Sequence, residues 1–137
     1  MRVEVRWSWV EDEADEAWNA TRCLFAFCDP ENDEILYVGH ADDRNVRDHC
    51  EASEHEVLWQ ELRAIGIANV SVLIGIPQDA RLRSDKALLG ELACLLITEL
   101  DPSGNEERDT EGPVRPGLEI ECSGDWPYEE ATFTALE

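Results

Sequence analysis

The side chains best suited to chemistry in this chain include its histidines, the first of which follows a tyrosine closely. His40 ends the segment Tyr37-Val38-Gly39-His40. A histidine that can form hydrogen bonds beside a tyrosine could act as a base or contact a phosphate. A partly exposed residue at the end of a hairpin is the simpler interpretation, and we favour it for His40.

The other two histidines lie among further residues of metal-binding type. His49 and His55 are close in sequence to Cys50, Glu51 and Glu54, which together could form a metal cluster. Their irregular spacing favours a solvated pair of helices instead. The five cysteines contain no C-x-x-C pair, so they indicate neither a zinc knuckle nor a disulfide framework, and we interpret them as mostly buried apolar residues.

Several segments have the hydrophobic pattern of strands. Residues 3–10 alternate between apolar and polar side chains, and residues 70–76 are β-branched and apolar up to Pro77, as in a central strand. Residues 22–27 and 34–38 flank a loop rich in turn formers, which predicts a hairpin. Residues 118–122 alternate as a short strand, and the residues after them are predicted to be an acidic tail.

Helical spacing is found in the intervening segments. Residues 43–51 and 54–65 predict two helices, the second of which ends at Gly66. The longest helix is expected to begin near Ser84 as N-cap, with Asp85 in its first turn, and to end at Leu100. Leucines at intervals of three and four residues predict that this helix packs on the sheet.

The order of these elements predicts an α/β fold with a small mixed or antiparallel sheet flanked by helices. At 137 residues the chain is expected to form a single domain, residues 1–137. Within it we distinguish a core of about residues 20–106, an additional N-terminal strand over residues 3–10, and an acidic C-terminal extension, residues 107–137, that includes the C-terminal strand. Residues 103–116 are polar and rich in proline and glycine, which predicts a loop.

The net charge is strongly negative. Asp and Glu number 32 against 11 Lys and Arg, which gives a formal charge of −21. Such a charge destabilises the compact state in dilute salt and is tolerated in concentrated salt, where screening is strong. Adaptation to a halophilic cytoplasm is our first explanation. The alternative is an acidic surface that mimics a nucleic-acid backbone and occupies a basic partner.

The sequence contains no apolar run near the roughly 20 residues that a membrane span needs. Its N-terminus, Met1-Arg2-Val3-Glu4-Val5, alternates charge and valine and does not have the apolar core of a signal peptide. We therefore expect a soluble cytoplasmic protein with no membrane partner.

Two separated parts of the chain resemble the GIY-YIG nuclease domain. The first is the hairpin that ends in Tyr37-Val38-Gly39. The second is the end of the long helix, where Leu96-Ile97 precedes Pro102 and, three residues later, Asn105. The resemblance covers roughly residues 20–106 and implies a GIY-YIG-like fold.

The resemblance assigns roles to individual residues. In these enzymes two tyrosines help to activate the attacking water, an arginine stabilises the phosphate, and a helical glutamate holds one divalent metal ion. Tyr37 matches the second tyrosine and Gly39 its glycine. Arg47 matches the arginine, with Arg44 as an alternative, and Asn105 matches the asparagine after the helix. Nucleic acid would be contacted by Gly39, His40, Arg44 and Asn105.

The chain departs from the family pattern at three positions. Phe25 replaces the first tyrosine, Ala93 replaces the metal-binding glutamate, and His40 stands where relatives often carry lysine. Glu91 and Glu99 are about 200° and about 240° from position 93 around the helix, so neither can substitute for it. We therefore expect no metal cofactor in the chain as written, and Mg²⁺ or Mn²⁺ only if it is an active nuclease.

Three functions are compatible with these residues. The first is a catalytically degenerate GIY-YIG domain that binds branched or single-stranded nucleic acid, or a protein partner. The second is a metal-dependent DNA endonuclease, in which position 93 has been inactivated by engineering or the metal is held otherwise. The third is an acidic, non-catalytic scaffold or nucleic-acid mimic. Seven of the basic residues lie within residues 22–86, which leaves room for a locally neutral DNA-binding face.

Overall fold

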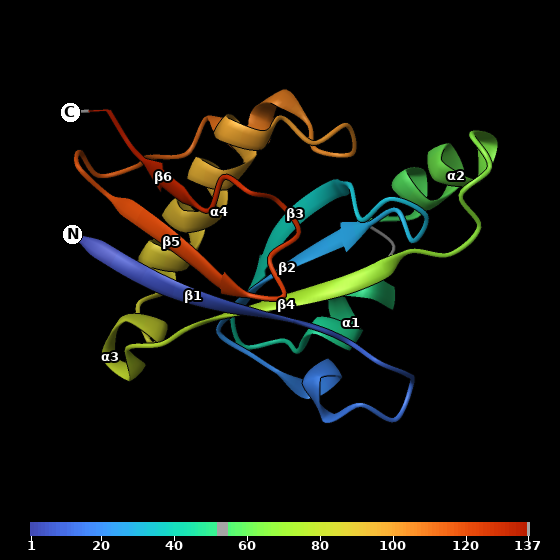
Figure 1. The fold of residues 1–137 in the computed structure, drawn as a ribbon, viewed down its shortest axis with the longest axis horizontal. Coiled ribbons are helices and arrows are strands. Elements are labelled where there is room, and N and C mark those ends of the chain that lie inside the picture. Colours follow the sequence, from blue (N-terminus) through green and yellow to red (C-terminus); the bar gives the residue numbers. More distant parts are fainter. Residues whose placement is uncertain (52–54, 137) are drawn as a thin grey trace.

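A computed structural model describes residues 1–51 and 55–136 of the chain, and a mixed sheet crosses the whole of this part (Figure 1). The strand order is β3-β2-β4-β1-β5-β6. Neighbouring strands are antiparallel except for β1 and β5, which are parallel. The predicted α/β class with a mixed sheet and flanking helices is confirmed. The strands are β1 (Arg2–Trp9), β2 (Cys23–Cys28), β3 (Ile35–Ala41), β4 (Ser71–Pro77), β5 (Glu119–Gly124) and β6 (Thr132–Thr134).

The strands follow the apolar pattern of the sequence. In β1 the side chains of Val3, Val5 and Trp7 are buried, and those between them are exposed. Every residue of β2 is buried, because this strand lies between β3 and β4 and both of its faces are covered. The predicted hairpin is formed by β2 and β3, which pair from Cys23 opposite Ala41 to Cys28 opposite Ile35.

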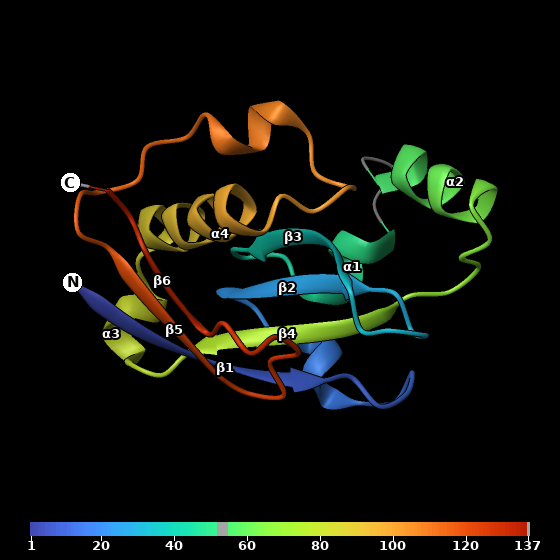
Figure 2. The same cartoon turned by 45° about the horizontal axis from the view of Figure 1, so that its top comes forward.

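Helices cover both faces of the sheet. The long helix α4 (Lys86–Leu100) packs on one face through buried leucines such as Leu88, Leu92 and Leu96. On the other face, α1 (Val46–Glu51), α2 (Glu56–Ala64) and a 3₁₀ turn (Glu16–Asn19) pack around Phe25 and Phe27. Figure 2 shows α4 and the Glu16–Asn19 turn on opposite sides of the sheet.

The helix boundaries differ from the prediction at several ends. A short helix, α3 (Ala80–Arg83), precedes α4 and was not predicted. Ser84 ends α3, and its hydroxyl donates to the Ala80 carbonyl at 3.3 Å, so the predicted N-cap at Ser84 is wrong. The N-cap of α4 is Asp85, whose carboxylate accepts from the Leu88 amide at 3.1 Å. The end of α2 before Gly66 is confirmed, and Gly66 has a positive φ of 92°. The helix predicted over residues 43–51 begins at residue 46, and the predicted start at residue 54 lies outside the described residues.

The C-terminal extension is part of the sheet, which corrects the prediction of an acidic tail after residue 122. Strand β6 pairs with β5, and Phe133 is buried in the core that α4 covers. Trp126 and Tyr128 pack against the same core, and the Tyr128 hydroxyl accepts a hydrogen bond from the Ile35 amide at 2.7 Å. The predicted loop over residues 103–116 contains a 3₁₀ turn (Glu107–Thr110). The extension therefore supports the start of β3.

The cysteines behave as apolar residues. All five are free, and four of them are buried. Burial raises the pKa of Cys23, Cys28 and Cys122 to about 12, so these thiols are poor nucleophiles at neutral pH. Among residues 1–51 and 55–136, no helix is long and apolar enough to cross a membrane.

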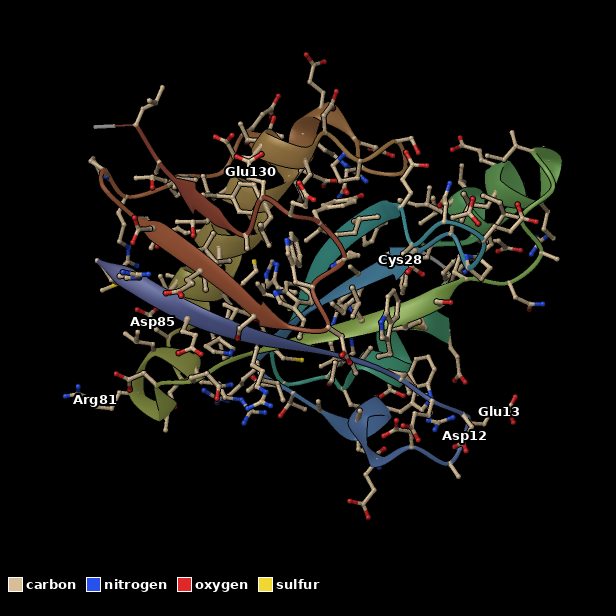
Figure 3. All side chains as sticks on the ribbon, viewed as in Figure 1. Asp12, Glu13, Cys28, Arg81, Asp85 and Glu130 are labelled. Carbon is tan, nitrogen blue, oxygen red and sulfur yellow. The ribbon has the colours of Figure 1, made fainter. Side chains whose placement is uncertain are left out.

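The outer surface carries the excess of acidic side chains. Figure 3 shows Asp12 and Glu13 at the periphery of the molecule, beyond the end of β1. We expect the free energy of unfolding to rise between 0.1 and 3 M KCl, because screening removes the repulsion within a protein of charge −21. Urea denaturation followed by circular dichroism measures it. A response that stays flat over this range would rule out the halophilic explanation.

Candidate functional site

A cavity of about 420 Å³ opens at the β3 edge of the sheet, where residues from both helical layers meet. We call it the edge cavity. Its walls come from β2, β3, α1, α2, α4 and the loop after α4. The lining residues are Phe25, Tyr37, Val38, Gly39, His40, His49, His55, Val57, Leu58, Glu61, Gly90, Ala93, Cys94, Ile97, Ser103, Gly104, Asn105, Glu106, Arg108 and Asp109.

Six residues that the sequence singled out line this one cavity. Tyr37, Gly39 and His40 reach it from β3, and Phe25 reaches it from β2. Ala93 lines it from α4, and Asn105 from the loop that follows. The fold thus brings together positions that lie up to 80 residues apart in the sequence.

Gly39 allows the ring of Phe25 to reach the cavity. The two residues are paired across β2 and β3, and a Cβ placed on Gly39 would lie 2.6 Å from Phe25 Cζ. Any side chain at position 39 would therefore collide with the ring. This contact explains glycine at position 39 by packing.

The aromatic wall continues from Phe25 through neighbouring rings. The ring of Tyr37 stacks on Phe27 with 5.3 Å between centroids and contacts the edge of His55 at 5.0 Å. The ring of His49 lies 5.5 Å from Phe25. Aromatic and imidazole rings therefore form a continuous surface on one side of the cavity.

All three histidines line the edge cavity, which the sequence analysis did not predict. His40 lies over Gly90 of α4, and its Nε2 is 3.9 Å from Asp42 Oδ1. The interpretation of His49 and His55 as a solvated helix pair is wrong for His55, which is only 6% exposed. The irregular spacing of the three histidines gave no sign of this grouping, because the histidines come from three different segments and meet only in the folded structure.

Asn105 holds the edge strand in place. Its Oδ1 accepts from the Val38 amide at 2.9 Å, and its Nδ2 donates to the Val38 carbonyl at 3.0 Å. The adjacent Gly104 amide donates to the Leu36 carbonyl at 2.7 Å. The loop thus pairs with the outer side of β3 as another strand would, which protects the edge. Both polar atoms of the Asn105 side chain are therefore used to position β3. The resemblance had assigned this side chain to a contact with nucleic acid.

Replacing Asn105 by alanine is expected to lower the free energy of unfolding by about 2 kcal/mol, because it leaves the Val38 amide and carbonyl without partners at a partly buried site. Urea denaturation in 2 M KCl measures the change. Asn69→Ala, at an exposed position, is the control and should change stability by less than about 0.5 kcal/mol. Equal effects of the two substitutions would contradict this role of Asn105.

Arg47, which the resemblance assigned to the arginine that stabilises the phosphate, does not line the edge cavity. Its guanidinium lies over the ring of Trp18, 5.4 Å from the centroid, and donates to the Glu13 carbonyl at 2.6 Å. The turn between β3 and α1 directs the side chain toward the Glu16–Asn19 turn. Arg44, the alternative, lies with Nη2 3.3 Å from His49 Nδ1, so it adjoins a lining residue.

The charged residues of the cavity are mostly acidic. Among the described residues, Glu61, Glu106 and Asp109 line it against a single guanidinium, that of Arg108. Arg108 is paired with Glu106 at 2.7 Å, and Asp109 accepts from the Glu106 amide at 2.9 Å. The cavity is therefore electronegative when the histidines are neutral.

The metal of GIY-YIG enzymes does not fit the residues at position 93. Ala93 provides no donor atom, and no group of three or more His, Cys, Asp or Glu in the described chain could hold a metal ion. Glu91 is absent from the lining, as its angular position on the helix predicted, and its carboxylate is paired with Arg115.

Comparisons with protein-family models, curated proteins and solved structures found no match for this chain.

Proposed function

We propose that the chain is a GIY-YIG-like domain that binds single-stranded or branched nucleic acid at the edge cavity without cleaving it. One observation carries this proposal: six positions chosen from the family pattern, between Phe25 and Asn105, line the same cavity. Four of these positions lie together on the β2–β3 hairpin, and Ala93 and Asn105 reach the same cavity from α4 and from the loop after it.

The absence of cleavage follows from the groups present. Phosphodiester cleavage needs positive charge and donors arranged around the phosphoryl oxygens. Here Phe25 lacks a hydroxyl, Ala93 lacks a carboxylate, and Arg47 is turned toward Trp18. The residues of the edge cavity are therefore suited to binding and poorly suited to this chemistry.

The acidic charge determines how binding depends on salt. Basic proteins lose affinity for nucleic acid as salt rises, because binding releases counterions. In this protein both partners are negative, so affinity should depend on stacking and hydrogen bonding and should rise as repulsion is screened. The sign of the salt dependence distinguishes this mode from ordinary electrostatic binding.

Fluorescence anisotropy with a labelled single-stranded oligonucleotide tests the proposal. Between 0.3 and 2 M KCl we expect binding that tightens with salt, and intact oligonucleotide after incubation with Mg²⁺ or Mn²⁺. Ala93→Leu should weaken binding at least tenfold because leucine fills the cavity, whereas Ala14→Leu, the same change at an exposed alanine, should not. Equal affinities for the two variants would refute binding at the edge cavity.

The same assay separates the alternatives. Metal-dependent cleavage by the chain as it stands would favour the endonuclease, for which the position of Ala93 in the same cavity as Tyr37 is the supporting observation. No binding at any salt concentration would favour the acidic scaffold or mimic, which would bind a basic protein.

A further inference from the structure

We infer that the edge cavity receives a single unpaired nucleobase that carries an exocyclic amino group, while the phosphates of the strand stay outside. This inference rests on the proposed function for the statement that the ligand is nucleic acid. It adds which part of the ligand enters the cavity and which kind of base is preferred.

The two walls of the cavity suit a flat ligand. One wall consists of the rings of Phe25, Tyr37 and His49. On the other face of β3, α4 presents small residues, Gly90 and Ala93, at a spacing of three, and both border the cavity where it passes the edge of the sheet. A Cβ on Gly90 would meet only the His40 ring, at 3.8 Å, so there is space along this wall. At about 420 Å³ the cavity lies within the range usual for small-molecule sites, about 300–1,000 Å³.

The charges of the cavity exclude a phosphate and favour a donor. Three carboxylates against one guanidinium make the described part of the lining net negative, which repels a phosphate group, and the carboxylates accept hydrogen bonds. Asp109 is bonded to Asn105 and to the Glu106 amide, and Glu106 is paired with Arg108.

Glu61 supplies the available acceptor. It lines the cavity from α2, and among the described residues its carboxylate has no hydrogen-bond or ion-pair partner. Carboxylates recognise the amino group of cytosine in nucleic-acid complexes. We therefore assign recognition of the amino group to Glu61.

A base within a duplex is disfavoured, because its Watson–Crick edge is occupied and it must first be unpaired and unstacked. A single-stranded region, or an unpaired end of a branch, presents its bases without this cost. The base is expected to stack on Tyr37 and His49, the ring residues of this wall that are partly exposed, whereas Phe25 is only 1% exposed and packs behind them.

Cytidine and uridine provide a matched pair of probes, since they differ mainly by an amino group in place of a carbonyl oxygen. Equilibrium dialysis in 2 M KCl should give cytidine an affinity at least about fivefold above that of uridine, which corresponds to about 1 kcal/mol. Cytidine 5′-monophosphate should bind no more tightly than cytidine. Glu61→Gln should remove the preference, whereas Glu56→Gln, on the same helix but outside the cavity, should retain it.

Filling the cavity provides the second arm. Gly90→Ala adds a single methyl group for which there is space, so the variant should fold and should weaken cytidine binding about threefold or more. Ala93→Leu should abolish cytidine binding. Circular dichroism checks that both variants are folded.

The outcomes separate the inference from the proposed function. Equal binding of cytidine and uridine, tighter binding of the monophosphate, or binding of oligonucleotides but of no nucleoside would each overturn the inference, and the last would leave the proposed function standing. Cytidine bound with the predicted preference, but no oligonucleotide bound, would support the base site and overturn the proposed function. Binding of neither would overturn both.

Discussion

Replacing Arg115 by alanine should lower the free energy of unfolding by about 2 kcal/mol, less than the cost of breaking a fully buried ion pair because the Arg115 side chain is 34% exposed. The Glu91 side chain on α4 is only 10% exposed, and Arg115 Nε lies 3.0 Å from each of its carboxylate oxygens. The Arg115 amide also donates to Glu91 Oε1 at 2.7 Å. Without the guanidinium, the Glu91 carboxylate stays buried but loses the positive charge and most of the hydrogen bonds that stabilise it there.

The pH dependence provides an independent check. Hydrogen bonds from Arg115 lower the pKa of Glu91 below its ordinary value of 4.5. A lowered folded-state pKa contributes stability above the unfolded value, and this contribution is lost as the pH falls through the folded value. The difference in free energy of unfolding between the wild type and Arg115→Ala should therefore have its largest value at pH 7 and should decrease below pH 4.5.

The matched control is Arg108→Ala. Arg108 pairs with Glu106 at 2.7 Å, but both side chains are largely exposed, so the cost should stay below about 1 kcal/mol. Urea denaturation in 2 M KCl gives the free energies for all three proteins. A cost for Arg115→Ala as small as that for Arg108→Ala would show that the Glu91 pair does not stabilise the fold.

Introducing the two side chains that the GIY-YIG pattern has and this chain lacks in the cavity should create metal-dependent nicking, if the proposed relation holds. In the double variant Phe25→Tyr, Ala93→Glu, a hydroxyl and a carboxylate are added to a cavity that already contains Tyr37. Metal ions stabilise the phosphoryl transition state by several kcal/mol, so nicking should exceed that of the present chain by at least about a hundredfold. It should stay below that of an intact site, because Arg47 remains turned toward Trp18. The measurement is plasmid nicking with Mn²⁺, together with Mn²⁺ titration by calorimetry.

Two controls define what this gain would mean. Ala14→Glu, at an exposed alanine, should confer neither metal binding nor nicking. Arg47→Ala in the double variant should leave nicking unchanged, because Arg47 packs on Trp18 outside the cavity. A double variant that is folded and binds Mn²⁺ but does not nick DNA would contradict the proposed relation to GIY-YIG enzymes.

Periodicity predicted the parts of the fold that bury regular apolar faces. The alternation of Val3, Val5 and Trp7 predicted β1, and the leucines of α4 predicted the helix on the sheet. Short elements had no such signal: α3 has four residues and β6 has three. Strand β6 is held by pairing with β5 and by the burial of Phe133, which are tertiary effects. Because neither effect is visible in the sequence, the excess of acidic residues around β6 led to the prediction of an acidic tail there.

The grouping of several predicted positions around one cavity was predictable from the strands and the helix that carry them. Tyr37 and Gly39 lie on the edge strand β3 and Ala93 lies on α4, which packs beside that edge on the other face of the sheet. Arg47 was misplaced because its direction depends on the turn before α1 and on Trp18, whose position no local pattern reveals. The grouping of the histidines likewise depends on tertiary structure, although all three lie within residues 40–55.

The three imidazoles allow a direct test of the claim that nucleic acid binds at the edge cavity. They are the only histidines of the chain and all line the cavity, so their ring Cε1–H proton signals report on this site alone. The signals can be assigned by replacing each histidine with glutamine. On titration with a cytosine-containing single strand in 2 M KCl, we expect all three signals to shift and to saturate together with the anisotropy. Saturable binding that leaves all three signals unmoved would contradict the claim.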